Sequence, residues 1–385
     1  MEMFRRTFAE VNLESLIHNW NQIKKVANDE RFICPMVKAN AYGHGDVQVS
    51  LALEKEGAKV LGVCLIEEGL LLRSSGVKSE ILVFRGFDKR GAEKILEYQL
   101  TPVVSTWEQI KALEAVADEV VKVHLKFNTG MNRIGFDCSD AEKLNTYFAK
   151  SKKLKLKALL THFSNSEDSH LEDGYSARQI IKFQDVIEKF QSHDLYYHLL
   201  NSGGIAGYAT GQNKLLRQRT WGFRPGLMLY GYQTASYFTE IDLKPVMSLK
   251  SVVNNIQQIK AGESVSYGST WTAARPSRIA VVPIGYADGV HRVVSNNSVA
   301  LFAQQQVPII GRVCMDFLML DVTDVVKESE INNWIEEEVT IFGYDEKNNF
   351  LSAELMAKKT NSIVWETLTS VSERVPRHFK GQKKL

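Results

Sequence analysis

The feature that most constrains the fold is an alternation of short apolar segments with amphipathic segments through the first part of the chain. Eight of the apolar segments have the length and the Val, Ile, Leu and aromatic content of buried strands. They are residues 31–37, 60–65, 81–84, 101–104, 121–127, 156–161, 196–200 and 221–224. Strands joined by helical crossovers pair in parallel, and eight of them predict an N-terminal (β/α)8 barrel of the TIM type.

The segments between the strand candidates have the apolar spacing of helices. Asn12 can cap a helix that carries Leu16, Trp20 and Ile23 on one face. Residues 92–98 and 177–190 show the same pattern. We therefore expect helices to surround the barrel strands.

From about residue 232 the pattern changes to strands that are joined by turns. The strand candidates here are residues 248–259, 278–283, 298–302, 308–321 and 338–342, and residues 352–360 form the one clear late helix. The chain is thus predicted to have two domains, a barrel over residues 11–235 and a mostly β domain over residues 236–385. Residues 1–10 contain a strand that could pack with either domain.

The composition argues against several classes of partner and site. A net charge of +2, with 24% charged residues, gives no indication of a nucleic-acid or membrane-surface partner. Residues 1–7 lack the apolar core of a signal peptide, and no segment of the sequence approaches the length of a transmembrane helix. The four cysteines form no CxxC pair, and the nine histidines form no zinc-binding pattern. We expect a cytoplasmic protein with reduced thiols and no structural metal.

Polar side chains follow several of the predicted barrel strands at the point where each strand ends. These residues are Lys38, Lys126, Arg133, His162, Asn201, Ser202 and Arg224. Singly they have ordinary explanations, because Asn201 and Ser202 could cap a helix and Arg133 could be a solvated charge. Together they favour function, since the carboxyl ends of barrel strands meet at one mouth, where active sites of TIM barrels lie.

Lys38 has the most informative surroundings of these residues. It ends an apolar segment and is followed by Ala-Asn-Ala-Tyr-Gly-His-Gly. Partial burial disfavours the charge of a lysine, so its amine can be neutral and nucleophilic. Glycines let the backbone approach a ligand closely. A nucleophilic lysine beside an anion-holding loop is the arrangement that pyridoxal phosphate requires.

The motifs of the chain, taken together, resemble those of the bacterial alanine racemases, which are pyridoxal-phosphate enzymes with a barrel and a β domain. The matching segments occur in family order along almost the whole chain. They are residues 37–45, 129–135, 161–163, 201–202, 224–231, 265–268, 285–289, 311–316 and 374–377.

This resemblance implies a two-base racemisation of L-alanine and D-alanine that supplies D-alanine for the cell wall. Lys38 would hold the cofactor as an aldimine and then act as the base on one face of the substrate. Tyr267 would act on the other face, from the β domain of the second subunit, with His162 as its partner. The resemblance therefore implies a homodimer whose active sites are shared between the chains.

The remaining site residues are also assigned by resemblance. Arg224 would donate to the pyridine nitrogen of the cofactor and be oriented by His198, and the permanent charge of arginine would keep that nitrogen unprotonated. His162 would bind the cofactor by supporting its ring from behind. The cofactor would further be bound by Tyr42, Asn201, Ser202, Gly226 and Leu227, the substrate by Arg133, Met315 and Tyr286, and the site would be supported by Lys126 and Asp316. Lys126 matches a position that is carboxylated in some members of the family.

Two departures from the family pattern leave alternatives open. Trp365 stands where the family usually has a tyrosine, which puts cofactor affinity and the placement of Tyr267 in question, and Asn128 replaces a usual aspartate. A racemase of a larger amino acid, such as serine or lysine, remains an alternative, as does a non-catalytic protein that binds pyridoxal phosphate. An amino-acid decarboxylase is disfavoured, because such enzymes typically place a carboxylate at the ring nitrogen.

Overall fold

The computed structural model describes residues 5–27, 32–190, 194–234 and 241–381, which cluster into two compact units. The barrel unit comprises Ser15–Ala41 and Asp46–Lys244, and the β unit comprises Met1–Glu14, Tyr42–Gly45 and Pro245–Leu385. The domain boundary predicted at residues 235 and 236 lies outside the described residues.

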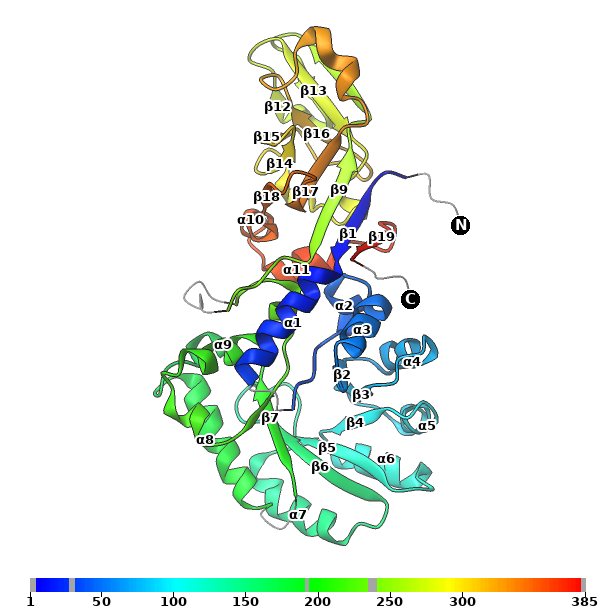
Figure 1. Ribbon diagram of the computed structural model, residues 1–385, viewed down its shortest axis with the longest axis vertical. Coiled ribbons are helices and arrows are strands. Elements are labelled where there is room, and N and C mark those ends of the chain that lie inside the picture. The colour runs from blue at the N-terminus through cyan, green and yellow to red at the C-terminus, as the bar shows by residue number, and fades with distance from the viewer. Residues whose placement is uncertain (1–4, 28–31, 191–193, 235–240, 382–385) are drawn as a thin grey trace. The chain divides into compact units, whose positions relative to one another are not determined.

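Parallel strands follow one another in chain order in the barrel unit (Figure 1). They are β2 (Val60–Val63), β3 (Glu80–Val83), β4 (Thr101–Val104), β5 (Val121–Lys126), β6 (Leu154–Leu160), β7 (Tyr196–Leu200) and β8 (Trp221–Phe223). Each lies within two residues of a predicted strand at either end, so the predicted parallel architecture is confirmed.

The first predicted strand, residues 31–37, is irregular where it is described, from residue 32 onward. Ile33 makes a parallel bridge to Phe223, and Met36 makes one to Gly62. Because one end of this segment pairs with β8 and the other with β2, the segment closes the ring as its eighth member. Pro35 explains the irregularity, since proline has no N–H for a ladder hydrogen bond.

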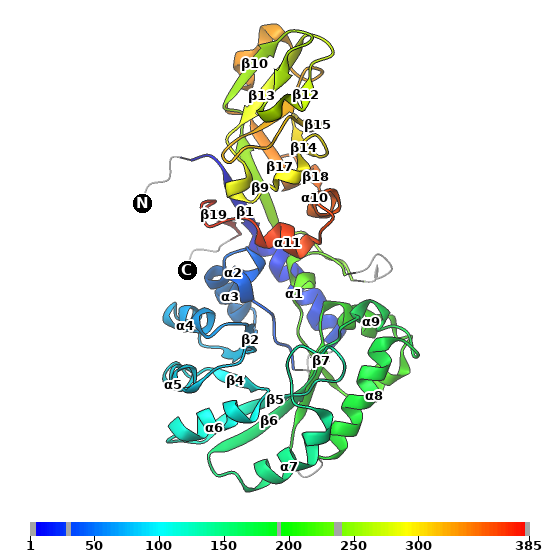
Figure 2. The same ribbon diagram turned by 180° about the vertical axis from the view of Figure 1, so that it is seen from behind.

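Helices surround the barrel strands, as Figure 2 also shows from behind. They include α1 (Leu13–Ala27), α3 (Asp46–Lys55), α4 (Ile66–Ser74), α5 (Lys89–Glu97), α6 (Trp107–Val116), α7 (Ala141–Lys150), α8 (Tyr175–Glu188) and α9 (Ser202–Thr210). Asn12 caps α1 as predicted, because its Oδ1 accepts the N–H of Glu14 at 3.0 Å. Leu16, Trp20 and Ile23 are buried, as expected for the inner face of this helix.

A large sheet forms the β unit. In the described part of the chain its strand order is β10–β13–β16–β15–β14–β17–β9–β1–β19, with β18 paired to β17. The strands are β1 (Phe8–Asn12), β9 (Met247–Val252), β10 (Asn255–Ile259), β13 (Ser277–Val282), β14 (Val299–Phe302), β15 (Gln305–Ile310), β16 (Leu318–Asp321), β17 (Glu338–Tyr344), β18 (Phe350–Leu351) and β19 (Arg377–Lys380). The opening strand, β1, pairs antiparallel with β9 and parallel with β19, so it belongs to this sheet.

Three details of the β unit differ from the sequence-based prediction. Residues 308–321, predicted as one strand, contain the end of β15 and all of β16, which pair antiparallel, so the chain turns back between Ile310 and Leu318. Residues 248–259 form two strands, because Val253 donates its N–H to Glu337 and Asn254 donates to Val281, so the chain changes partners between them. The late helix α10 (Ala353–Lys359) is followed by a second helix, α11 (Val364–Thr369). Six residues are too few for the helical period of the sequence to reveal it.

Candidate active site

Lys38 lies where the irregular first strand leaves the barrel, directly after the buried Val37. The next four residues are left-handed, with φ of 52° at Ala39, 54° at Asn40, 52° at Ala41 and 53° at Tyr42. A left-handed helical conformation costs a non-glycine residue roughly 1–2 kcal/mol. A strained turn therefore follows Lys38 directly, and strain of this kind concentrates at functional sites.

The Glu68 carboxylate holds the first peptide of this turn by a hydrogen bond. Its Oε1 accepts the N–H of Ala39 at 2.6 Å, and its Oε2 accepts those of Cys64 and Leu65 at 2.8 and 2.9 Å. Glu68 lies in the first turn of α4, where a carboxylate commonly accepts backbone N–H groups. Sequence reasoning missed this residue, and its capping position was the one signal that could have drawn attention to it.

The second half of the motif belongs to the β unit. Arg377 donates its Nε–H to the carbonyl of Gly43 at 2.9 Å. Gly43 has φ of 86°, and a Cβ at this position would lie 2.3 Å from the carbonyl oxygen of Leu368. The glycine is thus required by both its conformation and its close neighbour. Tyr42, predicted to bind the cofactor, is buried beside it.

Cationic side chains gather at the mouth of the barrel. Lys126 ends β5 with 6% of its surface exposed. Burial, and then Arg224, Arg133 and Lys38, lower its pKa to about 7. Burial and then Arg224 and Lys126 hold the pKa of His162 well below its usual range. These mutual effects arise because the predicted barrel residues lie near one another, and their positive potential suits an anionic ligand.

Arg224 follows β8 and is buried. Its Nη1 donates to His198 at Nδ1 (2.9 Å) and at the carbonyl (2.5 Å). Its Nη2 donates to the carbonyl of Thr161 at 2.6 Å and to His162 Nδ1 at 3.1 Å. Burial lowers the pKa of Arg224 to about 10, which still leaves it charged at neutral pH. Within the described residues Nε makes no hydrogen bond, so this N–H is the donor left for a ligand.

Hydroxyl and backbone donors form a cradle next to this arginine in the chain. Ser202 begins α9, and Asn201 caps that helix by accepting the N–H of Gly204 at 3.0 Å. Ser202 Oγ accepts the N–H groups of Gly226 and Met228 at 3.1 and 3.2 Å. Leu227 begins the short helix η4 (Leu227–Tyr230) between those two amides. A helix N-terminus together with turn amides is a common anion site, so the cradle fits a phosphate.

The predicted residues of the β unit have a different environment. Tyr267 opens the short helix η5 (Tyr267–Ser269), within the turn between β11 (Ser264–Val265) and β12 (Trp271–Thr272), and is 72% exposed. Tyr286 and Met315 are also exposed, at 42% and 52%. The loops of Tyr286 and Met315 are joined, because the N–H of Tyr286 donates to Cys314 and that of Ala287 to Met315, each at 3.0 Å.

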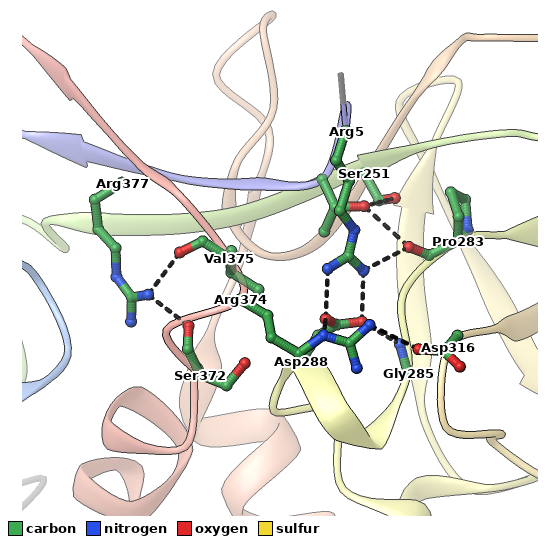
Figure 3. Close-up of polar contacts among 11 residues, drawn as sticks. Arg5, Ser251, Pro283, Gly285, Asp288, Asp316, Ser372, Arg374, Val375 and Arg377 are labelled. Atoms are coloured by element: carbon green, nitrogen blue, oxygen red, sulfur yellow. Dashed lines mark hydrogen bonds and ion pairs between the residues drawn. The ribbon is translucent and has the colours of Figure 1, made fainter. Parts of the chain in front are cut away.

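Figure 3 shows the polar cluster that supports these loops. The carboxylate of Asp288 is fully buried and accepts both Nη groups of Arg5 at 2.6 Å, as well as the N–H of Gly285 at 3.0 Å. Arg374 donates to Asp316 at 2.7 Å and lies 3.7 Å from Asp288. The predicted supporting residue Asp316 is therefore one part of a larger network, whose centre, Asp288, the sequence reasoning missed.

Sequence reasoning missed two further residues, on the strands that carry Lys126 and His198. His124 is fully buried on β5, two residues before Lys126, and Tyr196 lies on β7, two residues before His198. Residues two apart on a strand face the same side. This spacing from predicted site residues is the signal that could have found both.

Trp365, the departure from the family pattern, is half-buried on α11. Its carbonyl accepts the hydroxyl of Thr369 at 2.8 Å.

Two negative findings hold for the described residues. None of the helices there is long and apolar enough to cross a membrane, and no cluster of His, Cys, Asp and Glu has the arrangement of a metal site.

Known proteins resemble this chain over nearly its full length. Residues 11–234 match the family model for the alanine racemase N-terminal domain, and residues 246–379 match that for the C-terminal domain. "Alanine racemase 2" of Caldanaerobacter subterraneus is 35% identical over 383 residues, covering 97% of this chain and 95% of that protein.

Solved structures agree with this assignment. An alanine racemase of Clostridium difficile has a TM-score of 0.88 at 29% identity and covers 98% of this chain and 97% of its own. An alanine racemase of Bartonella henselae with covalently bound pyridoxal phosphate has a TM-score of 0.84 at 26% identity, covering 97% and 99%. With both domains matched along the chain, this protein belongs to the alanine racemase family.

Proposed function

We propose that this protein interconverts L-alanine and D-alanine with pyridoxal phosphate held on Lys38, as a homodimer with shared active sites. The observation that carries the proposal is the convergence of Lys38, Lys126, Arg133, His162 and Arg224 at one barrel mouth. The family membership of the chain supports the same reaction.

The donors in the barrel unit fit this cofactor. Lys38 supplies the amine that a pyridoxal aldehyde requires, and the cradle of Asn201, Ser202, Gly226 and Leu227 suits its phosphate. Arg224 Nε–H suits the pyridine nitrogen. When bound, the cofactor supplies the electron sink that lets the Cα proton of alanine be removed.

The side chains then have separate tasks. The amine of Lys38 takes or returns a proton on one face of Cα, and the phenol of Tyr267 does so on the other. The forked guanidinium of Arg133 orients the substrate carboxylate. Arg224 keeps its own protons and holds a fixed positive charge at the ring nitrogen, with the neutral His162 beside it.

Lys126 is suited to form a carbamate at this site. An amine reacts with carbon dioxide only when it is unprotonated, and a pKa of about 7 leaves much of Lys126 neutral under physiological conditions. The amine nitrogen would bond to the carbon of carbon dioxide and lose a proton, which leaves a carbamate anion. This anion would compensate the surrounding cations and orient Arg133.

The exposure of Tyr267 supports a shared site. A catalytic tyrosine requires a defined position at Cα, and a phenol that is 72% exposed has few contacts in its own chain to define one. Tyr286 and Met315 are exposed on joined loops of the same unit. We propose that a second copy of the chain covers these residues and that they complete its barrel mouth, narrowing access and contacting the substrate.

The function is tested by two measurements on the purified protein. Visible absorption reports cofactor bound through the lysine, and circular dichroism reports the loss of optical activity of L-alanine. We expect the cofactor band and decay of optical activity to zero, with both lost in Lys38→Ala. Decay with L-serine or L-lysine but not L-alanine would indicate a racemase of a larger amino acid, and a band without any decay would indicate a non-catalytic binding protein.

The cellular role follows from the product. D-alanine is a building block of the bacterial cell wall, and we propose that the enzyme supplies it in the cytoplasm. All four cysteines are free thiols, which fits a reducing compartment.

A further inference from the structure

We infer that a buried chain of hydrogen bonds through Tyr196, His124 and His198 fixes the position and the direction of Arg224, which makes His124 and Tyr196 positioning residues for the reaction. The inference rests on the proposed function, because that function assigns Arg224 to the cofactor ring. Both residues act on Arg224 through His198, and neither contacts the cofactor.

The contacts form one continuous series inside the barrel unit. Arg224 Nη1 lies 2.9 Å from His198 Nδ1, and His198 Nε2 lies 3.1 Å from His124 Nδ1. His124 Nε2 lies 2.8 Å from the hydroxyl of Tyr196. Each ring nitrogen of both histidines therefore has a partner.

The series occupies a part of the fold that is usually apolar. Interior side chains of a TIM barrel form layers from alternate strands, mostly of branched aliphatic residues. Here β5 and β7, two places apart in the sheet, contribute His124 and His198, both with 0% exposure. Phe32 packs against the series, with ring centroids 4.8 Å from His198 and 4.7 Å from Tyr196.

The guanidinium sets the direction of every hydrogen bond in the series. Arginine has donors and no acceptor, so His198 Nδ1 must accept and its proton must sit on Nε2. That N–H donates to His124 Nδ1, which places the proton of His124 on Nε2 as well. His124 then donates to the oxygen of Tyr196, which is partly buried at the first position of β7.

A single set of tautomers thus satisfies all the contacts. Burial and then Arg224 lower the pKa values of both imidazoles, that of His124 to about 3, which agrees with neutral rings. The series cannot carry protons to the cofactor, because it ends at a guanidinium that does not release them.

The series also compensates a charge that lacks an acidic partner. No carboxylate forms an ion pair with Arg224 in the described part of the chain, and backbone carbonyls of Thr161, His198 and Leu199 accept from it instead. The aligned imidazoles add their lone pairs on the side facing the cation. If His124 did not accept from Nε2–H, His198 could turn its ring or change tautomer, and the bond to Arg224 would be lost.

The tautomers are measured directly by nitrogen NMR of the protein with isotope-labelled histidine, in the presence and absence of cofactor. We expect His198 and His124 both to carry the proton on Nε2, assigned by loss of each signal in the corresponding variant. A proton on Nδ1 of either ring would overturn the inference. This result does not depend on activity, so it stays distinct from a wild-type protein that fails to racemise alanine, which would overturn the proposed function.

Variants separate positioning from general stability. We expect His124→Leu to lower kcat about 10-fold, as expected when a buried donor loses its acceptor, with KM for alanine changed little. His124→Asn retains an acceptor near the Nδ1 position and should recover most of kcat and the Nε2–H signal of His198. Tyr196→Phe should lower kcat about 2- to 5-fold, and Tyr197→Phe, on the opposite side of the same strand, should leave it unchanged.

Three outcomes would overturn the inference. The first is an unchanged kcat and His198 tautomer in folded His124→Leu, the second is equal loss in His124→Asn and His124→Leu, and the third is equal loss in Tyr196→Phe and Tyr197→Phe. If His124→Leu does not fold, the wild-type NMR result and the two tyrosine variants still test whether the series positions Arg224.

Discussion

The barrel unit and the β unit hold their functional residues in different ways. In the barrel unit Arg224 and Lys126 are 3% and 6% exposed, and Arg224 has several partners within the same unit. In the β unit Tyr267 is 72% exposed, and the buried group of the neighbouring polar cluster is the Asp288 carboxylate, which accepts from Arg5. The barrel unit thus holds its site residues through contacts within that unit, whereas the β unit exposes its site residues on loops next to buried polar contacts. A site shared between two chains would require both arrangements.

The largest expected effect concerns the exposed side of this comparison. Tyr267→Phe removes the proposed second base, and loss of a general acid–base group lowers the rate by about 10²- to 10⁴-fold. Cofactor should remain bound, because Lys38 and the cradle are unchanged. Racemisation measured by circular dichroism, together with the visible spectrum, tests both statements.

Mixed dimers test whether the site is shared. A heterodimer of Lys38→Ala and Tyr267→Phe chains would contain one intact site and one doubly changed site, so we expect about half of the wild-type activity. Dimers purified through two different tags provide the sample, and each homodimer is the control. An inactive heterodimer of confirmed composition would mean that both bases come from one chain.

The next effect concerns Lys126, the buried lysine whose pKa is lowered by burial and by Arg224. Its pKa is lowered from 10.5 to about 7, so between about pH 7 and pH 10 the unfolded chain holds a proton that the folded chain has released. The free energy of unfolding should therefore rise with pH across that window, and the destabilisation should be greatest below it. Lys126→Met should remove the slope and add roughly 2–5 kcal/mol at about pH 6.

Urea unfolding of the cofactor-free protein at several pH values measures this slope. Lys122→Met, an exposed position on the same strand, is the matched control and should keep the wild-type slope. The same slope in Lys126→Met would refute the prediction. A mass increase by one carbon dioxide, lost on acidification, would identify the carbamate form, in which the lysine no longer carries this charge.

A smaller effect compares two arginine–aspartate pairs of the β unit. Asp288 is fully buried against Arg5, and Asp324 pairs with Arg275 at 2.6 Å on the surface. Removing one partner of a buried pair leaves an uncompensated charge, so we expect Asp288→Asn to cost about 3 kcal/mol of unfolding free energy. Asp324→Asn should change it little. Similar losses in both variants, measured by urea unfolding, would remove the argument from burial.

The smallest effect concerns the left-handed turn after Lys38. Glu68→Gln keeps one acceptor oxygen but brings an amide group against backbone N–H donors, which should cost about 1–2 kcal/mol. Glu67→Gln, exposed on the same helix, is the control and should have no effect. If the two variants unfolded at the same urea concentration, the proposed role of Glu68 in holding the turn would be wrong.

Sequence reasoning predicted the elements better than it predicted the contacts. The strands 101–104 and 196–200 were placed at their observed bounds, because their apolar runs are short and clearly delimited. The first strand was predicted as regular, although Pro35 disrupts it, and α11 was missed because it is too short to show a period. Sequence reasoning also missed four site residues, because the residue type alone does not show whether a polar side chain is buried. They are Glu68, His124, Tyr196 and Asp288.

The sequence by itself determined the barrel, the β domain, the lysine motif and the membership of the alanine racemase family, because strand period, turn residues and motif spacing are local properties. Only the tertiary structure decided which polar groups meet. Arg224 lies 26 residues from His198 in the chain, and His198 lies 74 residues from His124, yet the three are hydrogen-bonded in series. Contacts of this kind depend on barrel closure and on the layer that each strand contributes, and no local pattern encodes them.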